Sequence, residues 1–197
     1  MSIDIVLASG NQGKIAEFQG ALDPLGFNVI AQSEFNVNDV AEDGFSFVEN
    51  AIIKARHASK QTGLPAIADD SGLEVQALNG EPGIFSARYA GEHGNDAANN
   101  IKLLTELKQH QNRSAKFQCA LAFFRFPNDP NPIISQAAWA GRILEQQTGE
   151  NGFGYDPLFF IPELEKTSAE LDPAEKKKIS HRALAIKDLF QKLKNNV

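Results

Sequence analysis

Apolar positions at the start of the chain follow two different periods, which predict strands and helices in alternation. A β-branched run over residues 3–8 predicts a strand, and Ile15 and Phe18 begin an apolar stripe at helical spacing. Residues 27–31 alternate between apolar and polar side chains, which predicts a second strand. The polar and acidic stretch over residues 32–45 is typical of a loop.

The next predicted helix begins with a capping box, in which Ser46 and Glu49 satisfy each other's backbone amides. It should end before Gly63, because glycine suits the left-handed residue that follows a helix. Residues 66–68 form a short apolar run, which predicts a buried strand. We expect this strand to end at the acidic turn over residues 69–72.

A long hairpin is predicted in the second half of the chain. Residues 116–126 and 133–143 have strand character, and the proline-rich segment between them is typical of a turn. Further helices are predicted over residues 96–109 and 172–193, the latter with proline at its first position. Alternating helices and strands followed by a hairpin indicate a single α/β domain, residues 1–197, with a mixed sheet.

Composition and charge narrow the possible partners. Hydrophobic residues make up 42% of the chain and charged residues 22%, which is typical of a globular protein. The single Cys119 excludes an intramolecular disulfide and a multi-cysteine metal site. A net charge of -6 disfavours nucleic acid, and no apolar stretch has the length of a membrane span. We therefore expect a cytoplasmic protein that binds neither nucleic acid nor membrane.

The first polar loop has the composition of a phosphate site. Glycines let the backbone approach a ligand, and a lysine at a helix start adds charge to amides that already attract anions. The loop lacks the P-loop pattern, because only two residues separate Gly10 from Gly13. An ordinary strand-to-helix turn with a solvated lysine explains this segment equally well. The segment consists of Ser9, Gly10, Asn11, Gln12, Gly13 and Lys14.

Two adjacent carboxylates, Asp69 and Asp70, directly follow the predicted strand at residues 66–68. Oxygen ligands at the carboxyl edge of a sheet suit a hard divalent cation, which would relieve the repulsion between them. Adjacent strand residues point to opposite faces, so one aspartate can bind a metal while the other caps backbone amides. We favour Asp70 for the metal, and an Asx turn before Gly72 is the alternative.

Three further segments carry a weaker signal. Beyond Glu42, a helix places Asn50 and Lys54 on one face, and an asparagine inside a helix needs a partner for its amide. Phe153, between two glycines, is suited to stack on a planar ring, although most aromatic residues at turns belong to the core. The cations around His181 could equally be a solvated helix face. Combined, these segments provide the groups that bind a nucleoside triphosphate.

Six short motifs follow one another along nearly the whole chain. They are Ser9-Gly10-Asn11-x-x-Lys14, Phe47-x-Glu49-Asn50-Ala51-x-x-Lys54-Ala55, Ala68-Asp69-Asp70-Ser71-Gly72-Leu73, Pro82-Gly83-x-x-Ser86-Ala87-Arg88, Gly152-Phe153-Gly154-Tyr155-Asp156-Pro157 and Ser180-His181-Arg182. Each motif is weak alone, but in this order they are specific, and they resemble the inosine triphosphate pyrophosphatase family, whose members hydrolyse noncanonical purine nucleotides.

This resemblance implies an elongated mixed α/β fold of two lobes with a cleft between them, a homodimer, and Mg²⁺-dependent hydrolysis of dITP, ITP and XTP to the monophosphate and pyrophosphate. Asp70 is the implied general base, and Lys14 and Lys54 are the implied catalytic cations. Asp70 and Glu42 are the implied Mg²⁺ ligands, with Asp69 as the alternative to Glu42. The implied substrate-binding residues are Ser9, Gly10, Asn11, Gln12, Gly13, Lys14, Ser71, Phe153, Gly154, Tyr155, Asp156, Lys176, His181 and Arg182.

The implied reaction is attack of water on the α-phosphorus, with pyrophosphate as the leaving group. A carboxylate with an ordinary pKa of about 4 is a weak base, so we expect Asp70 to orient the water more than to take its proton. Selection of a 6-oxo purine over adenine needs a hydrogen-bond donor, for which His181, Arg182 and a backbone amide are the candidates.

Two other functions remain open from the sequence. A pyrophosphatase acting on modified pyrimidine nucleotides would share the phosphate loop and carboxylates, although Phe153 and residues 180–182 argue against it. A nucleotide-sensing module without turnover is disfavoured because Lys14, Lys54 and Asp70 are all present.

Overall fold

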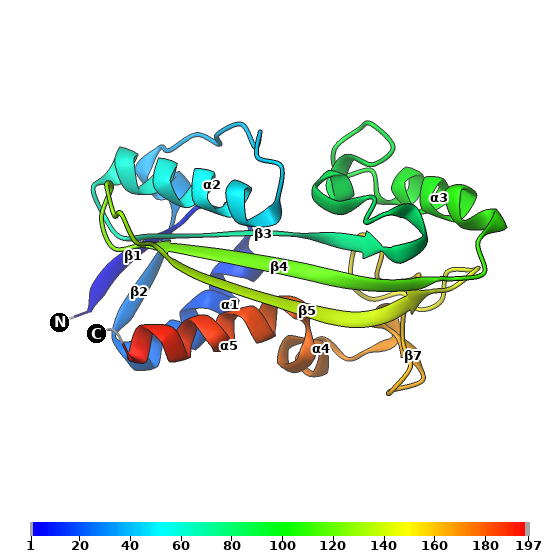
Figure 1. Ribbon diagram of the computed structural model, residues 1–197. Helices are drawn as coiled ribbons and strands as arrows, with labels where there is room; N and C mark the ends of the chain where they lie inside the picture. The colour runs from blue at the N-terminus through cyan, green and yellow to red at the C-terminus, as the bar shows by residue number, and fades with distance from the viewer. Residues whose placement is uncertain (1, 196–197) are drawn as a thin grey trace. The chain divides into compact units, whose positions relative to one another are not determined.

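The computed structural model describes residues 2–195 and contains a seven-stranded sheet (Figure 1). Its strands are β1 (Ile3–Leu7), β2 (Phe27–Ala31), β3 (Ala66–Val75), β4 (Ser114–Phe124), β5 (Ile133–Ile143), β6 (Phe159–Ile161) and β7 (Lys166–Thr167). The strand order is β2-β1-β3-β4-β5-β6-β7. Strand β1 pairs in parallel with β2 and β3, whereas β6 is antiparallel to β5 and β7. The predicted α/β class with a mixed sheet is confirmed.

Helices flank the sheet. They are α1 (Gln12–Leu22), α2 (Phe47–Thr62), α3 (Asp96–Glu106), α4 (Pro173–Ile179) and α5 (His181–Lys194). Figure 1 shows α2 on one side of the strands, and α1 and α5 together on the other side. Within residues 2–195, no helix has both the length and the apolar character needed to cross a membrane.

The chain forms two compact units, each with its own core. Unit 1 comprises Met1–Asp70, Cys119–Ala137 and Arg182–Val197, and unit 2 comprises Ser71–Gln118 and Ala138–His181. Strands β3, β4 and β5 contribute residues to both units.

In unit 1, apolar side chains pack on both faces of the sheet. On one face, α1 and α5 bury Phe18 and Leu189 against a cluster that includes Ile67 of β3. On the other face, Ala51 of α2 packs in a cluster with Ala68 of β3. Neighbouring residues of β3 therefore face opposite layers, as the pleat of a strand requires.

Several aromatic side chains pack together in the core of unit 2. The ring of Phe159 lies 4.5 Å from that of Phe117 and 5.5 Å from that of Trp139, measured between centroids. Gly141 lies against the same ring, because a Cβ at this position would come within 2.6 Å of Phe159. Only glycine lets β5 approach the aromatic cluster this closely.

Most of the elements predicted from the pattern are present. The hairpin forms from β4 and β5, close to the predicted ranges. The cap of α2 is confirmed in part, because Ser46 Oγ accepts a hydrogen bond from Glu49 N at 3.2 Å. The Glu49 carboxylate instead accepts hydrogen bonds from Phe45 N and Ser46 Oγ.

Two predictions were wrong. The strand expected over residues 66–68 continues to Val75, so Asp69 and Asp70 lie within β3 rather than in a turn. Their carboxylates pair with side chains of flanking helices and leave the backbone in the strand. The single helix expected over residues 172–193 is broken at Ser180, whose backbone is extended (φ -65, ψ 159). Serine favours this conformation at the start of a helix.

Candidate active site

The first polar loop leads into the N-terminus of α1. Asn11 is the N-cap residue, and its side chain accepts a hydrogen bond from Lys14 N at 3.1 Å. Asn11 N donates in turn to Ser9 Oγ at 3.1 Å. A Cβ built at Gly10 would meet no atom within 4 Å, so the space beside this backbone is open. Exposed amides at a helix N-terminus attract anions, and the loop has the form expected of a phosphate site.

Lys14 belongs to a buried ion cluster with Asp69 and Arg182. The Asp69 side chain is 1% exposed and accepts hydrogen bonds from Lys14 Nζ at 2.8 Å and Arg182 Nε at 3.1 Å. Burial alone would raise the pKa of Asp69, but Lys14 and Arg182 outweigh it and hold this pKa well below its usual range. Two cations therefore neutralise this carboxylate without a metal.

Asp70 faces the opposite side of β3 and contacts α2. Its Oδ1 lies 3.0 Å from Lys54 Nζ, and Glu42 Oε1 lies 3.3 Å from the same nitrogen. Its Oδ2 accepts a hydrogen bond from Asn50 Nδ2 at 3.3 Å. One lysine therefore serves two carboxylates on this face.

The pKa values on this face reflect the unequal charges. Burial raises the pKa of Asp70 to about 6, with a further contribution from Glu42, and Lys54 opposes the increase. Burial alone would lower the pKa of Lys54, but Asp70 and Glu42 outweigh it and raise this pKa. The expectation of an ordinary pKa near 4 for Asp70 was wrong, because the sequence does not reveal how deeply the carboxylate is buried.

Asp70 and Glu42 fit a hard divalent cation better than Asp69 does. They offer two carboxylates against one ammonium group, so a further cation would improve the local charge balance. Among residues 2–195, no group of three or more His, Cys, Asp or Glu side chains is arranged to hold a metal by itself. Mg²⁺ is commonly bound by one or two carboxylates together with substrate phosphates and water. This pair therefore fits a Mg²⁺ ion whose remaining ligands would be water molecules, or phosphate oxygens when a phosphate ligand is bound.

In unit 2, Asp156 organises the glycine-rich loop. Its Oδ2 accepts hydrogen bonds from Phe153 N at 2.9 Å and from Lys176 Nζ, and its Oδ1 accepts one from Ser168 Oγ at 2.8 Å. Gly152 has a φ of +83, and a Cβ there would lie 2.2 Å from Asp156 Oδ2. Both the backbone conformation and the space require glycine. Asp156 is buried, and its contacts hold this loop in place.

Two aromatic residues of the same loop have different environments. Phe153 is 68% exposed, and Lys176 Nζ lies 5.2 Å from the centroid of its ring. Tyr155 is buried, and its hydroxyl donates a hydrogen bond to Ser86 O at 2.9 Å. Phe153 can therefore offer a ring face to a ligand, whereas Tyr155 supports the loop from inside.

Two polar side chains that the sequence analysis did not select hold the loop at Gly154. Gly154 N donates to Asp96 Oδ2 at 2.6 Å, and Gly154 O accepts from Asn100 Nδ2 at 2.8 Å. Asp96 and Asn100 are one turn apart in α3, which places them on the same helix face. This spacing was the only local signal, because both partners are more than 50 residues away in the sequence.

His181 is buried in unit 2 and stacks on Phe117, with ring centroids 4.9 Å apart and planes inclined by 16°. Ser71 is half-buried in β3, directly after Asp70. Arg182, next to His181 in the sequence, belongs to unit 1 and forms an ion pair with Asp69. Ser71 therefore lies in β3, and His181 and Arg182 are the first two residues of α5.

The predicted site residues fall into two groups, one in each unit. The group in unit 1 consists of Ser9, Gly10, Asn11, Gln12, Gly13, Lys14, Glu42, Lys54, Asp70 and Arg182. The group in unit 2 consists of Ser71, Phe153, Gly154, Tyr155, Asp156, Lys176 and His181.

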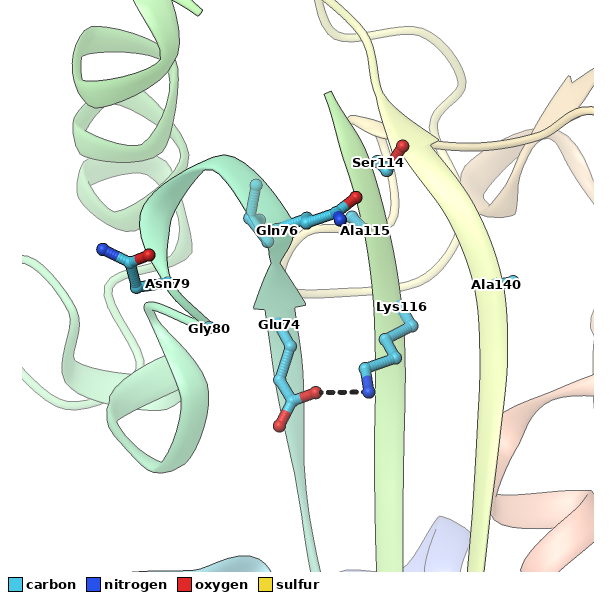
Figure 2. A pocket seen from close by; sticks show the side chains of 9 residues that line it. Glu74, Gln76, Asn79, Gly80, Ser114, Ala115, Lys116 and Ala140 are labelled. Carbon is cyan, nitrogen blue, oxygen red and sulfur yellow. Dashed lines mark ion pairs between the residues drawn. The ribbon is translucent and has the colours of Figure 1, made fainter. Parts of the chain in front are cut away.

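A cavity of about 460 Å³ in unit 2 is lined by none of these residues (Figure 2). Its wall includes Gln76, Gly80 and Ala140, and its charged groups are the paired Lys116 and Glu74, 3.0 Å apart. An ion pair that is already satisfied within the protein offers little to a polyanion. We therefore take the two residue groups, each within its own unit, as the candidate functional residues, and not the lining of this cavity.

The fold and the site define an α/β protein whose cations, carboxylates and glycine loops suit a phosphorylated ligand. A sequence model of the Ham1 family matches residues 5–192, and the chain belongs to this family. The family resemblance predicted from the motifs is confirmed.

Individual relatives match the chain over nearly its full length. A dITP/XTP pyrophosphatase of Vibrio parahaemolyticus is 59% identical over 191 residues, which cover 96% of this chain and 96% of that protein. A HAM1 protein from Coxiella burnetii has a TM-score of 0.95 and 51% identity, covering 98% of this chain and 99% of that one. The Ham1 protein of Staphylococcus aureus has a TM-score of 0.91 and 46% identity, covering 98% and 100%.

Proposed function

We propose that this protein is a nucleoside triphosphate pyrophosphatase that hydrolyses dITP, XTP and ITP to the monophosphate and pyrophosphate. The main support for this proposal is the arrangement of charged side chains at β3. On one face of the strand, Asp69 pairs with Lys14 and Arg182. On the other face, Lys54 pairs with both Asp70 and Glu42. The names of relatives such as the Vibrio parahaemolyticus enzyme support the same activity.

Triphosphate binding is assigned to the loop before α1. The backbone of Ser9, Gly10 and Asn11 borders open space at the helix N-terminus, and the first helical residues Gln12 and Gly13 are exposed. The amides of Gly10, Gln12 and Gly13 would hold phosphate oxygens, because the first amides of a helix have no carbonyl partner within that helix. Lys14, at 26% side-chain exposure, would add a positive charge that Asp69 keeps in a defined position.

Asp70 and Glu42 are assigned as the ligands of Mg²⁺. When bound, the ion would neutralise phosphate charge and increase the acidity of a bound water molecule. Asp70 would orient the attacking water and is the candidate general base. Lys54, held by both carboxylates, stabilises negative charge that develops on the leaving pyrophosphate.

The nucleoside is assigned to the residues of unit 2. Phe153 would stack on the purine ring, while Lys176 stays beside it through its contact with Asp156. Gly154 and Tyr155 set the path of this loop, and Ser71, which follows Asp70 in β3, would contact the nucleotide.

The 6-oxo group of the purine would be read by His181, Arg182 or a backbone amide. Adenine carries a 6-amino group, which cannot accept a hydrogen bond and would leave a buried donor without a partner. The cost of that unpaired donor would reject ATP. The expected homodimer, cytoplasmic location and lack of nucleic-acid binding belong to the same proposal.

The test is pyrophosphate release from a panel of dITP, XTP, ITP, ATP, GTP and modified pyrimidine triphosphates, each with and without Mg²⁺. We expect Mg²⁺-dependent release with kcat/KM at least 100-fold higher for the 6-oxo purines dITP, XTP and ITP than for ATP. The highest rate on pyrimidine nucleotides would support the alternative pyrophosphatase. Tight binding with no release from any nucleotide would support the sensing module.

A further inference from the structure

Asn50 is a fully buried polar residue in α2, one turn before Lys54. Its Oδ1 accepts a hydrogen bond from Gly44 N at 2.9 Å, and its Nδ2 donates to Asp70 Oδ2 at 3.3 Å. A buried amide that lost these partners would be costly, so the bonds account for an asparagine at a helical position where the residue is otherwise unfavourable.

The orientation of this amide follows from the chemistry of its neighbours. Gly44 N–H can only donate, so it must face the oxygen of Asn50. The ionised Asp70 carboxylate can only accept, so it must face the Asn50 NH₂ group. No other orientation satisfies both partners, and Asn50 therefore links the loop at Gly44 to Asp70 in one defined geometry.

This link reaches both carboxylates assigned to the metal. Asn50 holds Oδ2 of Asp70, while Lys54 holds its Oδ1. Glu42 lies two residues before Gly44, so the bond from Gly44 N fixes the loop that carries the second ligand. Gly44 is closely packed, since a Cβ there would lie 2.7 Å from Asn50 Oδ1.

We propose that Asn50 is a positioning residue that sets the spacing between Asp70 and Glu42 for a divalent cation. The inference rests on the proposed function and deepens it, because Asn50 would act through the two ligands rather than by contact with substrate. Groups that orient metal ligands typically affect metal affinity by about 10- to 100-fold.

The first test compares Asn50→Leu with a matched control, Asn99→Leu. Asn99 is also a buried helical asparagine, and it accepts from Ala90 N at 2.7 Å and donates to Ala87 O at 3.4 Å. Both substitutions remove two hydrogen bonds from a buried amide, but Asn99 has no carboxylate partner among these contacts. Thermal unfolding would measure the structural cost common to both.

Mn²⁺ binding, followed by electron paramagnetic resonance without nucleotide, is the readout that a purely structural role would not change. We expect Asn50→Leu to weaken Mn²⁺ binding about 10- to 100-fold and to raise the Mg²⁺ concentration for half-maximal turnover by a similar factor. Asn99→Leu should leave both values at those of the parent protein. Equal Mn²⁺ affinity in Asn50→Leu and the parent would overturn the inference.

Gly44→Ala keeps the test decisive if Asn50→Leu does not fold. The added methyl group displaces the loop from Asn50 without removing its amide. A weaker Mn²⁺ affinity in this variant supports the inference, and an unchanged affinity overturns it. Nucleotide hydrolysis by the parent protein without any divalent cation would overturn both the metal assignment and this inference. Mn²⁺ binding as tight as in the parent, measured in Asn50→Leu or Gly44→Ala, would overturn the inference alone.

Discussion

The two faces of β3 treat the same side chain in opposite ways. Asp69 is neutralised by two cations, Lys14 and Arg182, which hold its pKa well below the usual range. Asp70 shares one cation, Lys54, with Glu42, and burial raises its pKa to about 6. The charge of Asp69 is thus balanced inside the protein, whereas the pair on the other face has negative charge to spare. This difference favours Glu42 over Asp69 as the second metal ligand.

Asp70→Asn should have the largest effect of any change to this pair. An amide keeps the size of the side chain but is a poor ligand and a poor base, so kcat should fall by about 10³-fold. Pyrophosphate release measures the rate, and circular dichroism checks the fold. Asp129→Asn is the control, because Asp129 is buried in contact with Arg125 and belongs to neither group of site residues. Turnover near the parent rate in Asp70→Asn would remove Asp70 from the mechanism.

Asp69→Asn should mainly reduce stability. It leaves Lys14 and the largely buried Arg182 without their carboxylate, which should lower the free energy of unfolding by about 2 to 3 kcal/mol. Urea denaturation measures the loss, and the Mg²⁺ concentration for half-maximal turnover should not change. If that concentration rises as it would for a lost ligand, the contrast between the two faces is wrong.

Mg²⁺ itself should separate the two aspartates. A ligand that binds only the folded state at ten times its Kd stabilises that state by about 1.4 kcal/mol, which raises Tm by a few degrees. We expect this increase in the parent protein and in Asp69→Asn, and none in Asp70→Asn. An equal increase in all three proteins would place the ion elsewhere.

The smallest expected effect is a pH-dependent gain in stability. A carboxyl whose pKa is higher in the folded state makes folding less favourable above that pKa, and this penalty disappears as the pH falls from about 6 toward 4. Without divalent cations, Asp70→Asn should therefore be more stable than the parent at pH 8. The gain should vanish near pH 4, and a gain that persists there would have another cause.

The sequence reveals much of the local structure but little about which distant side chains pair with each other. Strand alternation and turn chemistry predicted the β4–β5 hairpin, because both are local signals. The extension of β3 to Val75 was missed, since an acidic pair followed by glycine has the local signature of a turn. Cations from flanking helices pair with both aspartates, and these partners are too distant in the sequence for a local pattern to reveal them.

For the site, residue types were easier to predict than residue roles. The sequence drew attention to both Asp69 and Asp70. It did not reveal that Asp69 pairs with Arg182, because the two residues are 113 positions apart. Asn50 gave a usable warning, because an amide inside a helix needs partners and the structure supplies two. No local sequence signal indicated the raised pKa of Asp70, because the burial of its carboxylate depends on the complete fold.

The pleat of β3 also affects how relatives of this protein should be aligned. Ile67 and Asp69 face one layer of unit 1, and Ala68 and Asp70 face the other. The two aspartates are therefore identical residues that differ only in which face of the strand they occupy. An alignment shifted by one residue would still match aspartate to aspartate, yet it would exchange the aspartate that pairs with Lys14 and Arg182 for the one proposed as a metal ligand. To assign the role of either aspartate to a relative, the strand must therefore be aligned residue by residue; finding the motif is not enough.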